Sequence, residues 1–226
     1  MDVKELVYGT FIEEVKNRFL CKVKIQDEII ECYIPSSCRL ENFIRLNGST
    51  VLLKENKTNG CRTKYSVFAV KSGRTFVLLN LSQCNRIIEE QIHKQMFSFL
   101  GKRNNVVREK TVEGYKCDLF IKDTKTIIEV KSIISNSKTA LFPTVHSERG
   151  TKQLFKLCEL MGSGYHVCYV FASLIPDVTE IRINSEDVPY SNYFKQCINK
   201  GMTCLGLTIK MSKNTFAISQ LIPINY

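Results

Sequence analysis

The chain of 226 residues has no tryptophan, only three histidines, and no pair of cysteines spaced as Cys-x-x-Cys. Structural zinc sites use closely spaced cysteine and histidine ligands, so these shortages argue against a zinc finger. The ten cysteines would suit a disulfide framework in a short secreted chain. This chain is not short, and its first residues lack the charged and then apolar layout of a secretory signal. We therefore expect reduced thiols and a cytoplasmic location.

Long apolar runs are also missing. A helix that crosses a bilayer needs about 20 consecutive apolar residues, and no stretch approaches that length, so we expect no membrane partner. What the chain has in excess is positive charge, with 32 Lys and Arg against 22 Asp and Glu and a formal net charge of +10. This balance favours an anionic partner, for which nucleic acid is the commonest candidate. Dispersed lysines that only solubilise the surface are the alternative.

The first 81 residues form a pattern of short strands separated by turns. Glycines at 48, 60 and 73 lie between the apolar segments. About five strands in so short a segment predict a small closed barrel, of which the OB-fold is one kind that binds nucleic acid. A barrel without a ligand fits the pattern equally well. The strands are expected at 14–25, 28–34, 49–54, 65–70 and 75–79.

From residue 82 onwards, helices alternate with strands. Apolar residues at helical spacing predict a helix over 85–100, and Ser147 is a suitable N-cap for a second one. Such a succession predicts an α/β sandwich with a mixed sheet. The expected fold class is therefore α/β (α+β), with an OB-like barrel domain at 1–81 and an α/β domain at 82–226. The remaining elements are a helix at 189–200 and strands at 106–110, 115–132 (a hairpin), 165–174, 202–211 and 215–222.

One hairpin holds the most credible catalytic group of the chain. If a four-residue loop at 122–125 joins its strands, Asp118 lies directly opposite Glu129. Side chains alternate between the two faces of a strand, so Lys131 shares a face with both carboxylates. The two carboxylates and the ammonium group then converge. The alternate positions, which we expect to point into a core, are Leu119, Ile121, Ile128 and Val130.

Two carboxylates so close together repel each other, and a proton, a cationic side chain or a metal ion relieves the repulsion. Oxygen ligands suit magnesium, so Asp118, Glu129 and the carbonyl of Val130 predict a site for Mg²⁺ or Mn²⁺. Lys131 would orient or help to deprotonate an attacking water and neutralise charge on a phosphate. The expected reaction is phosphodiester hydrolysis. The motif alone also fits an ordinary solvated strand with a weak ion pair.

The surrounding residues resemble the sugar fermentation stimulation protein A (SfsA) family. The stretches that match are Asn85 to Glu90, Arg108-Glu109, Gly114, Asp118, Glu129 to Ser132, Ala140 to Pro143, Ser147 to Lys152, and Pro176 to Val178. The resemblance implies DNA binding and an OB-like barrel joined to a domain similar to PD-(D/E)XK nucleases. It assigns catalysis to Asp118, Glu129 and Lys131. It also favours Glu90 over Glu89 as a further metal ligand, a choice that the helical wheel leaves open.

Several residues outside the carboxylate group are expected to bind nucleic acid. Ser147 precedes a helix whose first turns hold Arg149 and Lys152, where free backbone N–H groups and the helix dipole favour a phosphate. The planar fork of Arg149 matches phosphate oxygens best. Gln153 can reach a nucleotide or flank the core. Arg108 completes the set of nucleic-acid contacts.

Three functions follow from this sequence. The leading one is a DNA-binding protein with magnesium-dependent phosphodiester hydrolysis. The second is a DNA-binding regulator of sugar metabolism genes that uses a nuclease-like fold without cutting. The third is a structural scaffold whose charge serves only solubility. We expect DNA rather than RNA as the partner, and a homodimer stays open as the assembly state.

Overall fold

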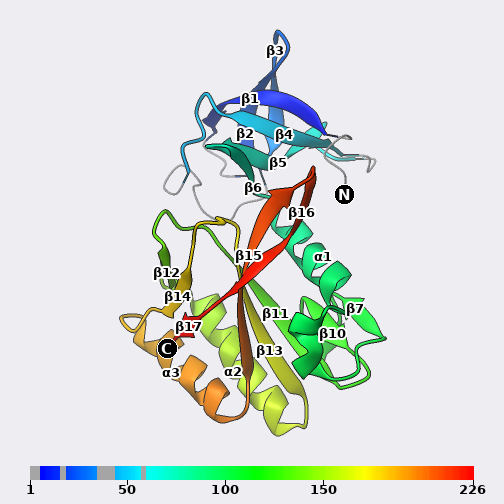
Figure 1. Cartoon of the computed structure of the whole chain (residues 1–226), viewed down its shortest axis with the longest axis vertical. Coiled ribbons are helices and arrows are strands. Elements are labelled where there is room, and N and C mark those ends of the chain that lie inside the picture. The colour runs from blue at the N-terminus through cyan, green and yellow to red at the C-terminus, as the bar shows by residue number, and fades with distance from the viewer. Residues whose placement is uncertain (1–5, 16–18, 35–43, 57–59) are drawn as a thin grey trace.

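The computed structural model describes residues 6–15, 19–34, 44–56 and 60–226. The barrel lies at one end and the α/β part at the other (Figure 1). The hairpin of β15 (Thr203–Ser212) and β16 (Thr215–Ile222) extends from the second part to the first. The fold class predicted from the sequence is confirmed. The barrel strands are β1 (Val7–Glu14), β2 (Leu20–Ile25), β3 (Glu28–Tyr33), β4 (Thr50–Glu55), β5 (Tyr65–Ser72) and β6 (Thr75–Leu78).

Strand pairing in the barrel follows the order β3-β2-β1-β4-β5-β6, and Tyr33 of β3 also pairs with Ser66 of β5. This last pairing closes a ring of five strands, with β6 added outside it, which is the OB-like barrel expected from the sequence. One expectation was wrong. A single strand over 14–25 was predicted, whereas Val7–Glu14 forms a separate strand β1 that pairs with β2. Its glycine and exposed tyrosine interrupt the apolar alternation that identifies strands.

The α/β part is built on a mixed sheet in the order β16-β15-β13-β11-β10-β7. Strands β7, β10 and β11 are antiparallel, and helix α2 then connects β11 to the parallel strand β13. Its elements are α1 (Leu81–Gln91), a 3-10 helix (Gln95–Leu100), β7 (Val106–Arg108), β8 (Thr111–Val112), β9 (Tyr115–Lys116), β10 (Leu119–Ile121), β11 (Thr126–Ile133), β12 (Thr139–Phe142), α2 (Glu148–Gly162), β13 (His166–Ser173), β14 (Glu180–Ile183), α3 (Val188–Asn199), β15 (Thr203–Ser212), β16 (Thr215–Ile222) and β17 (Ile224–Asn225).

The first helix of this part differs from the prediction. A continuous helix was expected over 85–100, but α1 begins at Leu81 and ends at Gln91, and a 3-10 helix follows. The Arg103 side chain donates a 2.8 Å hydrogen bond from Nε to the carbonyl of Ile92. A carbonyl at the end of a helix lacks an intrahelical partner, so this distant arginine stabilises a break that local periodicity does not reveal.

The two faces of the main sheet are covered by different elements. Leu119, Ile121 and Ile128 point to one face, where they share a core with α1 and with the barrel. Phe120 and Ile127 point to the other face, where α2 and α3 pack. The predicted inward positions on the hairpin are therefore confirmed, with Val130 partly buried against the same core.

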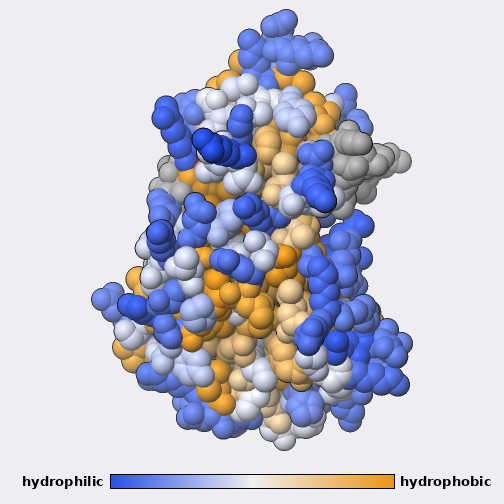
Figure 2. Space-filling view, viewed as in Figure 1, coloured by the Kyte–Doolittle hydropathy of each residue, from blue (hydrophilic) through white to orange (hydrophobic). Residues whose placement is uncertain are grey.

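The barrel and the α/β part share one continuous apolar core. Phe68 of β5 packs edge to face against Phe216 of β16, with ring centroids 5.7 Å apart. Leu79, in the link to α1, is buried and donates its N–H to the carbonyl of Phe68. Apolar residues are also exposed along the middle of the molecule, over β15 and β16 (Figure 2). The domain boundary between 81 and 82 stays a prediction, because the core runs on across it.

Three findings concern the described residues as a whole. None of their helices is long and apolar enough to cross a membrane. Their cysteines are free thiols, and most of them are buried. Within the same residues, no cluster of three or more histidine, cysteine or acidic side chains could hold a metal ion.

Candidate metal centre and active site

The β10–β11 hairpin sets the position of the two carboxylates. Leu119 pairs with Ile128 and Ile121 pairs with Thr126, which is the register inferred from a four-residue loop. Asp118 precedes β10 by one residue and faces the segment around Glu129. Its Oδ2 accepts a 2.8 Å hydrogen bond from the backbone N–H of Val130. The Asp118 carboxylate thus accepts the hydrogen bond that a backbone carbonyl would otherwise accept from Val130, at the end of the pairing between β10 and β11.

Helix α1 contributes the second partner of Asp118. Oδ1 of this carboxylate accepts a 2.8 Å hydrogen bond from Nδ2 of Asn85. Burial and then the nearby Glu129 carboxylate raise the pKa of Asp118 above its ordinary value, and the bonds from Val130 and Asn85 oppose the rise. Asp118 is therefore a carboxylate whose charged form is disfavoured, in a position where a cation would relieve the cost.

Glu129 is almost completely buried, with 4% of the residue exposed, and has three hydrogen-bond donors. The Tyr115 hydroxyl donates to Oε2 over 2.6 Å. Lys131 Nζ and Gln153 Nε2 both donate to Oε1, over 2.8 and 3.0 Å. A buried charge is tolerated only when it is paired and hydrogen-bonded, and these three side chains meet that condition.

Lys131 is held as firmly as its carboxylate partner. Besides the bond to Glu129, Nζ donates to Oε1 of Gln153 over 2.7 Å. It also lies over the ring of the fully buried Tyr169, 5.7 Å from the centroid. An ammonium group has three donors, so one donor remains after the bonds to Glu129 and Gln153. The Lys131 ammonium group therefore lies in the wall of the cleft with one of its N–H donors unused by these two bonds.

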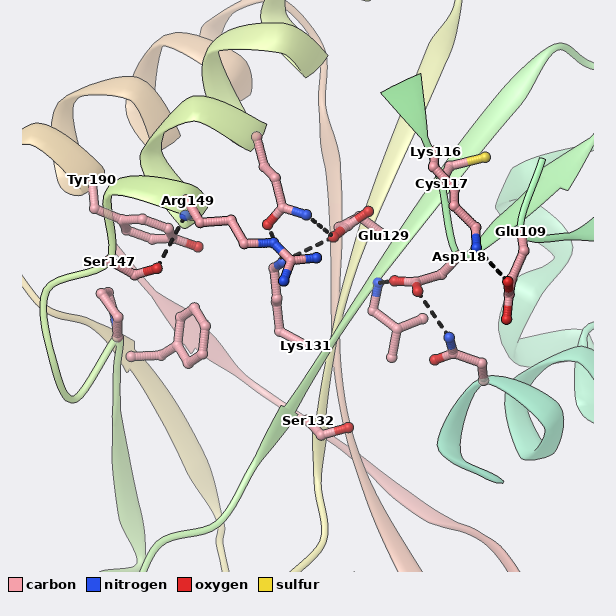
Figure 3. Close-up of a pocket in the computed structure, with 16 residues that line it drawn as sticks. Glu109, Lys116, Cys117, Asp118, Glu129, Lys131, Ser132, Ser147, Arg149 and Tyr190 are labelled. Carbon is pink, nitrogen blue, oxygen red and sulfur yellow. Dashed lines mark hydrogen bonds and ion pairs between the residues drawn. The ribbon is translucent and has the colours of Figure 1, made fainter. Parts of the chain in front are cut away.

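These groups line a cleft of about 570 Å³ between β11, α1 and the start of α2. Figure 3 shows Lys131 and Glu129 beside Arg149 on one side, and Asp118 near Glu109 and Lys116 on the other. Ser147 accepts a 3.1 Å bond from the N–H of Gly150, so it is the N-cap of α2 as predicted. The cleft is lined by Asn85, Glu109, Lys116, Cys117, Asp118, Glu129, Val130, Lys131, Ser132, Phe142, Pro143, Ser147, Arg149, Gly150, Gln153 and Tyr190.

The sequence-predicted residues separate into two groups. Asp118, Glu129, Val130, Lys131, Ser147, Arg149 and Gln153 all line the cleft. Glu90, Arg108 and Lys152 do not. Lys152 is 80% exposed and pairs with Glu148. It borders a neighbouring hollow of about 520 Å³, which shares Arg149 and Gln153 with the cleft.

Glu90 is the main correction to the expected ligand set. Its half-exposed carboxylate pairs with Arg86 over 2.8 Å along the same helix, and it is absent from the cleft wall. Glu89 bonds instead to Arg108 over 3.0 Å, which also removes Arg108 from the cleft. Asn85, one helical turn before Glu89, is the α1 residue that reaches Asp118. The structure therefore gives no support to Glu90 as a ligand.

Two residues of the site were missed in the sequence. Tyr115 belongs to a two-residue strand, and no spacing connects it with Glu129. Asn85 was identified only as part of a stretch that resembles the family, and nothing in the sequence predicted that its amide would bond to Asp118. Gln153 was expected to contact nucleic acid, whereas in the structure both ends of its amide bond to Glu129 and Lys131.

The chemistry of the donors fits an oxygen-seeking divalent cation. Both oxygens of Asp118 and Oε2 of Glu129 accept one hydrogen bond each and keep a further lone pair. The Val130 carbonyl belongs to the same segment. Magnesium is commonly bound by one or two carboxylates together with waters and substrate phosphates. These donors are all oxygens, which suits magnesium better than zinc.

A closed OB-like barrel fused to a mixed α/β sheet with a buried carboxylate–lysine group defines the class of this protein. The chain belongs to the sugar fermentation stimulation protein (SfsA) family. Residues 82–215 match the family's "Sugar fermentation stimulation protein RE domain", and residues 15–79 match its "SfsA N-terminal OB domain".

Curated relatives match this chain over most of their own length. A sugar fermentation stimulation protein homolog of Desulforamulus reducens is 27% identical over 224 residues, which are 97% of this chain and 92% of the relative. A homolog of Clostridium kluyveri is 28% identical over 187 residues, 81% of this chain and 80% of the relative. The structure of Pyrococcus furiosus SfsA in complex with Ca²⁺ has a TM-score of 0.85 at 20% identity, and covers 100% of this chain and 98% of that one. This likeness confirms the fold.

Proposed function

We propose that this protein binds nucleic acid, DNA rather than RNA, and hydrolyses its phosphodiester bonds with Mg²⁺ or Mn²⁺ at Asp118, Glu129 and Lys131. One observation carries the proposal. A buried carboxylate, a partly buried one and an ammonium group meet in one cleft, and each is fixed by hydrogen bonds from a different element. Buried charges in a cleft are costly and gather at functional sites.

Asp118 and Glu129 would hold the cation, with the Val130 carbonyl as a third oxygen. When bound there, the cation supplies Lewis-acid polarisation of a phosphoryl oxygen and lowers the pKa of a bound water. Asn85 and the N–H of Val130 keep the Asp118 carboxylate turned towards the cleft. Tyr115 does the same for Glu129. Fixed ligands need no rearrangement when charge develops in the transition state.

Lys131 would act on the phosphate and on the attacking water. Its remaining N–H can donate to a phosphoryl oxygen or to the water, and its charge offsets the negative charge that accumulates during attack. Gln153 and Glu129 fix the ammonium group between them, so the donor direction is set before substrate binds. Such positioning of a catalytic group lowers the entropic part of the barrier.

Arg149 would receive the phosphate next to the scissile one. It lies in the first turn of α2, where Ser147 caps the helix and the backbone N–H groups favour an anion. A guanidinium group binds phosphate oxygens in pairs. Lys116, which pairs with Glu109, lies on the opposite wall. A strand crossing between the two would pass over Asp118 and Glu129.

The solved relative supports the choice of cation. Pyrococcus furiosus SfsA was solved in complex with Ca²⁺, a cation that, like Mg²⁺, is bound by oxygen ligands. The net charge of +10 supports a polyanionic substrate.

Cleavage of labelled single-stranded DNA, duplex DNA and RNA tests the proposal. We expect turnover with Mg²⁺ or Mn²⁺, none with EDTA, and a loss of at least about 100-fold in Glu129→Ala and Lys131→Ala, the scale of a lost electrostatic contact in catalysis. Arg182→Gln is the matched control, because Arg182 is an exposed residue that pairs with Glu180 away from the cleft. Turnover that persists with EDTA, or in both cleft variants, would overturn the proposal.

A second candidate is a DNA-binding regulator that does not cut. It is favoured by the closed network around Glu129, in which both carboxylate oxygens and Lys131 already have partners. The name of the relatives, sugar fermentation stimulation protein homolog, is in line with a regulatory role. This candidate predicts salt-sensitive DNA binding, with log affinity falling roughly linearly against log salt, and no cleavage with any divalent cation.

A further inference from the structure

A hollow on the outer wall of the barrel lies apart from the catalytic cleft. Its volume is about 380 Å³, which falls in the range of small-ligand sites. It is formed by β1, by the end of β2 with the turn that follows, and by the start of β4. Its lining consists of Tyr8, Gly9, Thr10, Lys24, Gln26 and Thr50.

Tyr8 gives this hollow an exposed aromatic wall. The residue is 59% exposed, and its ring meets that of Phe76 edge to face, with centroids 6.4 Å apart and planes at 74°. The contact supports the ring from β6 and leaves ring surface open to solvent. At the next position, a Cβ on Gly9 would lie 2.5 Å from Cγ1 of Val23. The missing side chain of Gly9 therefore lets β1 pack closely on β2 next to Tyr8.

The charges near Tyr8 favour an anion. Lys24 lines the hollow, and its nearest carboxylate, Asp27, lies 3.9 Å away with a fully exposed side chain. Lys71 pairs with Phe76 across the β5–β6 hairpin, whose turn holds Arg74. Lys71 and Arg74 are both exposed, and neither forms an ion pair within the described residues. The described residues of the barrel up to residue 80 contain eight basic and six acidic residues, so the attraction for an anion comes from these particular cations beside Tyr8 and not from the barrel as a whole.

We propose that this face of the barrel binds a single-stranded segment of nucleic acid, with a base stacked on Tyr8 and phosphates beside Lys24 and the Lys71–Arg74 turn. Stacking on an exposed aromatic ring requires an unpaired base, because a duplex base is already stacked and paired. OB-folds bind oligonucleotides chiefly on strands 2 and 3. In this hollow Lys24 is the residue from β2, and the other strand residues come from β1 and β4. The inference rests on the proposed function for the choice of nucleic acid as the partner. It assigns the preference for single-stranded over duplex nucleic acid to the barrel.

Binding without cleavage tests this inference. Fluorescence anisotropy with EDTA present would compare a labelled oligothymidylate of about 20 nucleotides, longer than one OB-fold covers, with a duplex of equal length. Tyr8→Ala should weaken single-strand binding about 5- to 100-fold, the loss that one stacked base produces. Tyr8→Phe, which keeps the ring, should bind within about twofold of wild type. Tyr226→Ala is the matched control, because Tyr226 is also 59% exposed but lies in the α/β part.

The outcomes separate this inference from the catalytic proposal. Single-strand affinity that is unchanged in Tyr8→Ala, or that falls equally in Tyr226→Ala, overturns the barrel site. An equal loss for the duplex overturns the strand preference. Glu129→Gln should abolish cleavage and leave single-strand affinity unchanged. A wild-type protein that never cleaves, yet binds single strands through Tyr8, would remove the catalytic proposal and retain the barrel site.

Discussion

The Tyr115 hydroxyl donates a 2.6 Å hydrogen bond to Oε2 of the buried Glu129 carboxylate. Burial and then that carboxylate raise the pKa of Tyr115 above its ordinary value of 10.0, so the hydroxyl stays a donor over the physiological pH range. The bond connects the short β8–β9 hairpin to the central strand β11. It also fixes one oxygen of Glu129, while Lys131 and Gln153 engage the other.

Removing this hydroxyl should reduce both stability and activity. Tyr115→Phe leaves a buried carboxylate oxygen without its donor, a change that costs about 1–3 kcal/mol. We expect a lower midpoint of urea unfolding and a slower cleavage rate. Tyr193→Phe is the control, since Tyr193 is only partly buried and contacts Phe155 through its ring. Equal effects of the two substitutions would contradict a special role for Tyr115.

The ion pair between Lys131 and Glu129 should behave as a buried pair. The two side chains are 17% and 5% exposed, and removing one partner of a buried pair costs about 3–5 kcal/mol because the other charge is left alone. Lys131→Met should therefore destabilise the protein strongly, and the double variant Glu129→Gln with Lys131→Met should regain most of the loss. Denaturant unfolding of the double-mutant cycle measures this. Additive effects would show that the charges do not depend on each other.

The raised pKa of Asp118 predicts the direction in which stability changes with pH and on substitution. Its folded-state pKa lies above the ordinary 3.8, chiefly through burial. Its ionised form therefore costs stability at pH values above the raised pKa, and the cost disappears as the pH falls through that pKa to below 3.8. Without divalent cations at pH 7, Asp118→Asn should unfold about 2–4 °C higher than wild type, roughly 1 kcal/mol in a chain of this size.

Thermal unfolding scans from neutral to acidic pH check this prediction. The gain of Asp118→Asn should shrink as the pH falls and vanish in strong acid. Adding Mg²⁺ at pH 7 should stabilise only the wild type, because a ligand stabilises the state that binds it. A variant that is less stable than wild type at pH 7 in EDTA would show that burial imposes no cost on Asp118.

The shared core predicts that the barrel and the α/β part unfold together. Phe68→Ala removes a buried ring that packs on Phe216, and such a loss costs about 3–5 kcal/mol. Hydrogen exchange should show β4 and β13 losing protection at the same denaturant concentration, in the wild type and in this variant. Phe155→Ala, at a half-exposed position, should have a much smaller effect. Separate unfolding of β4 would mean that the two parts are independent.

Local patterns predicted the elements that carry the site. A short loop at 122–125 predicted the register that brings Asp118 opposite Glu129. Alternation of buried and exposed side chains then predicted which residues share a face, since a slip of one residue would reverse every side chain. Ser147 was predicted as a cap because serine is favoured just before a helix, and in the structure its hydroxyl accepts from the N–H of Gly150. These features depend on neighbours within a few residues or on one turn.

Contacts between distant segments could not be predicted in the same way. Tyr115 and Gln153 approach Glu129 from a short hairpin and from a helix, and neither separation leaves a periodic trace. The sequence did not show that Glu90 lies outside the cleft, because the direction of a helical side chain depends on which face of the helix packs. Here that face places Asn85 towards Asp118 and leaves Glu90 with Arg86. Tertiary packing decides such cases.

Calorimetric titration with Mg²⁺ and Ca²⁺ tests the central claim, a divalent cation site at Asp118 and Glu129. We predict one saturable site in the wild type, which is lost in Asp118→Asn and in Glu129→Gln and is retained in Glu90→Gln. Binding of equal strength in the double variant Asp118→Asn with Glu129→Gln, or no binding by the wild type, would contradict the account.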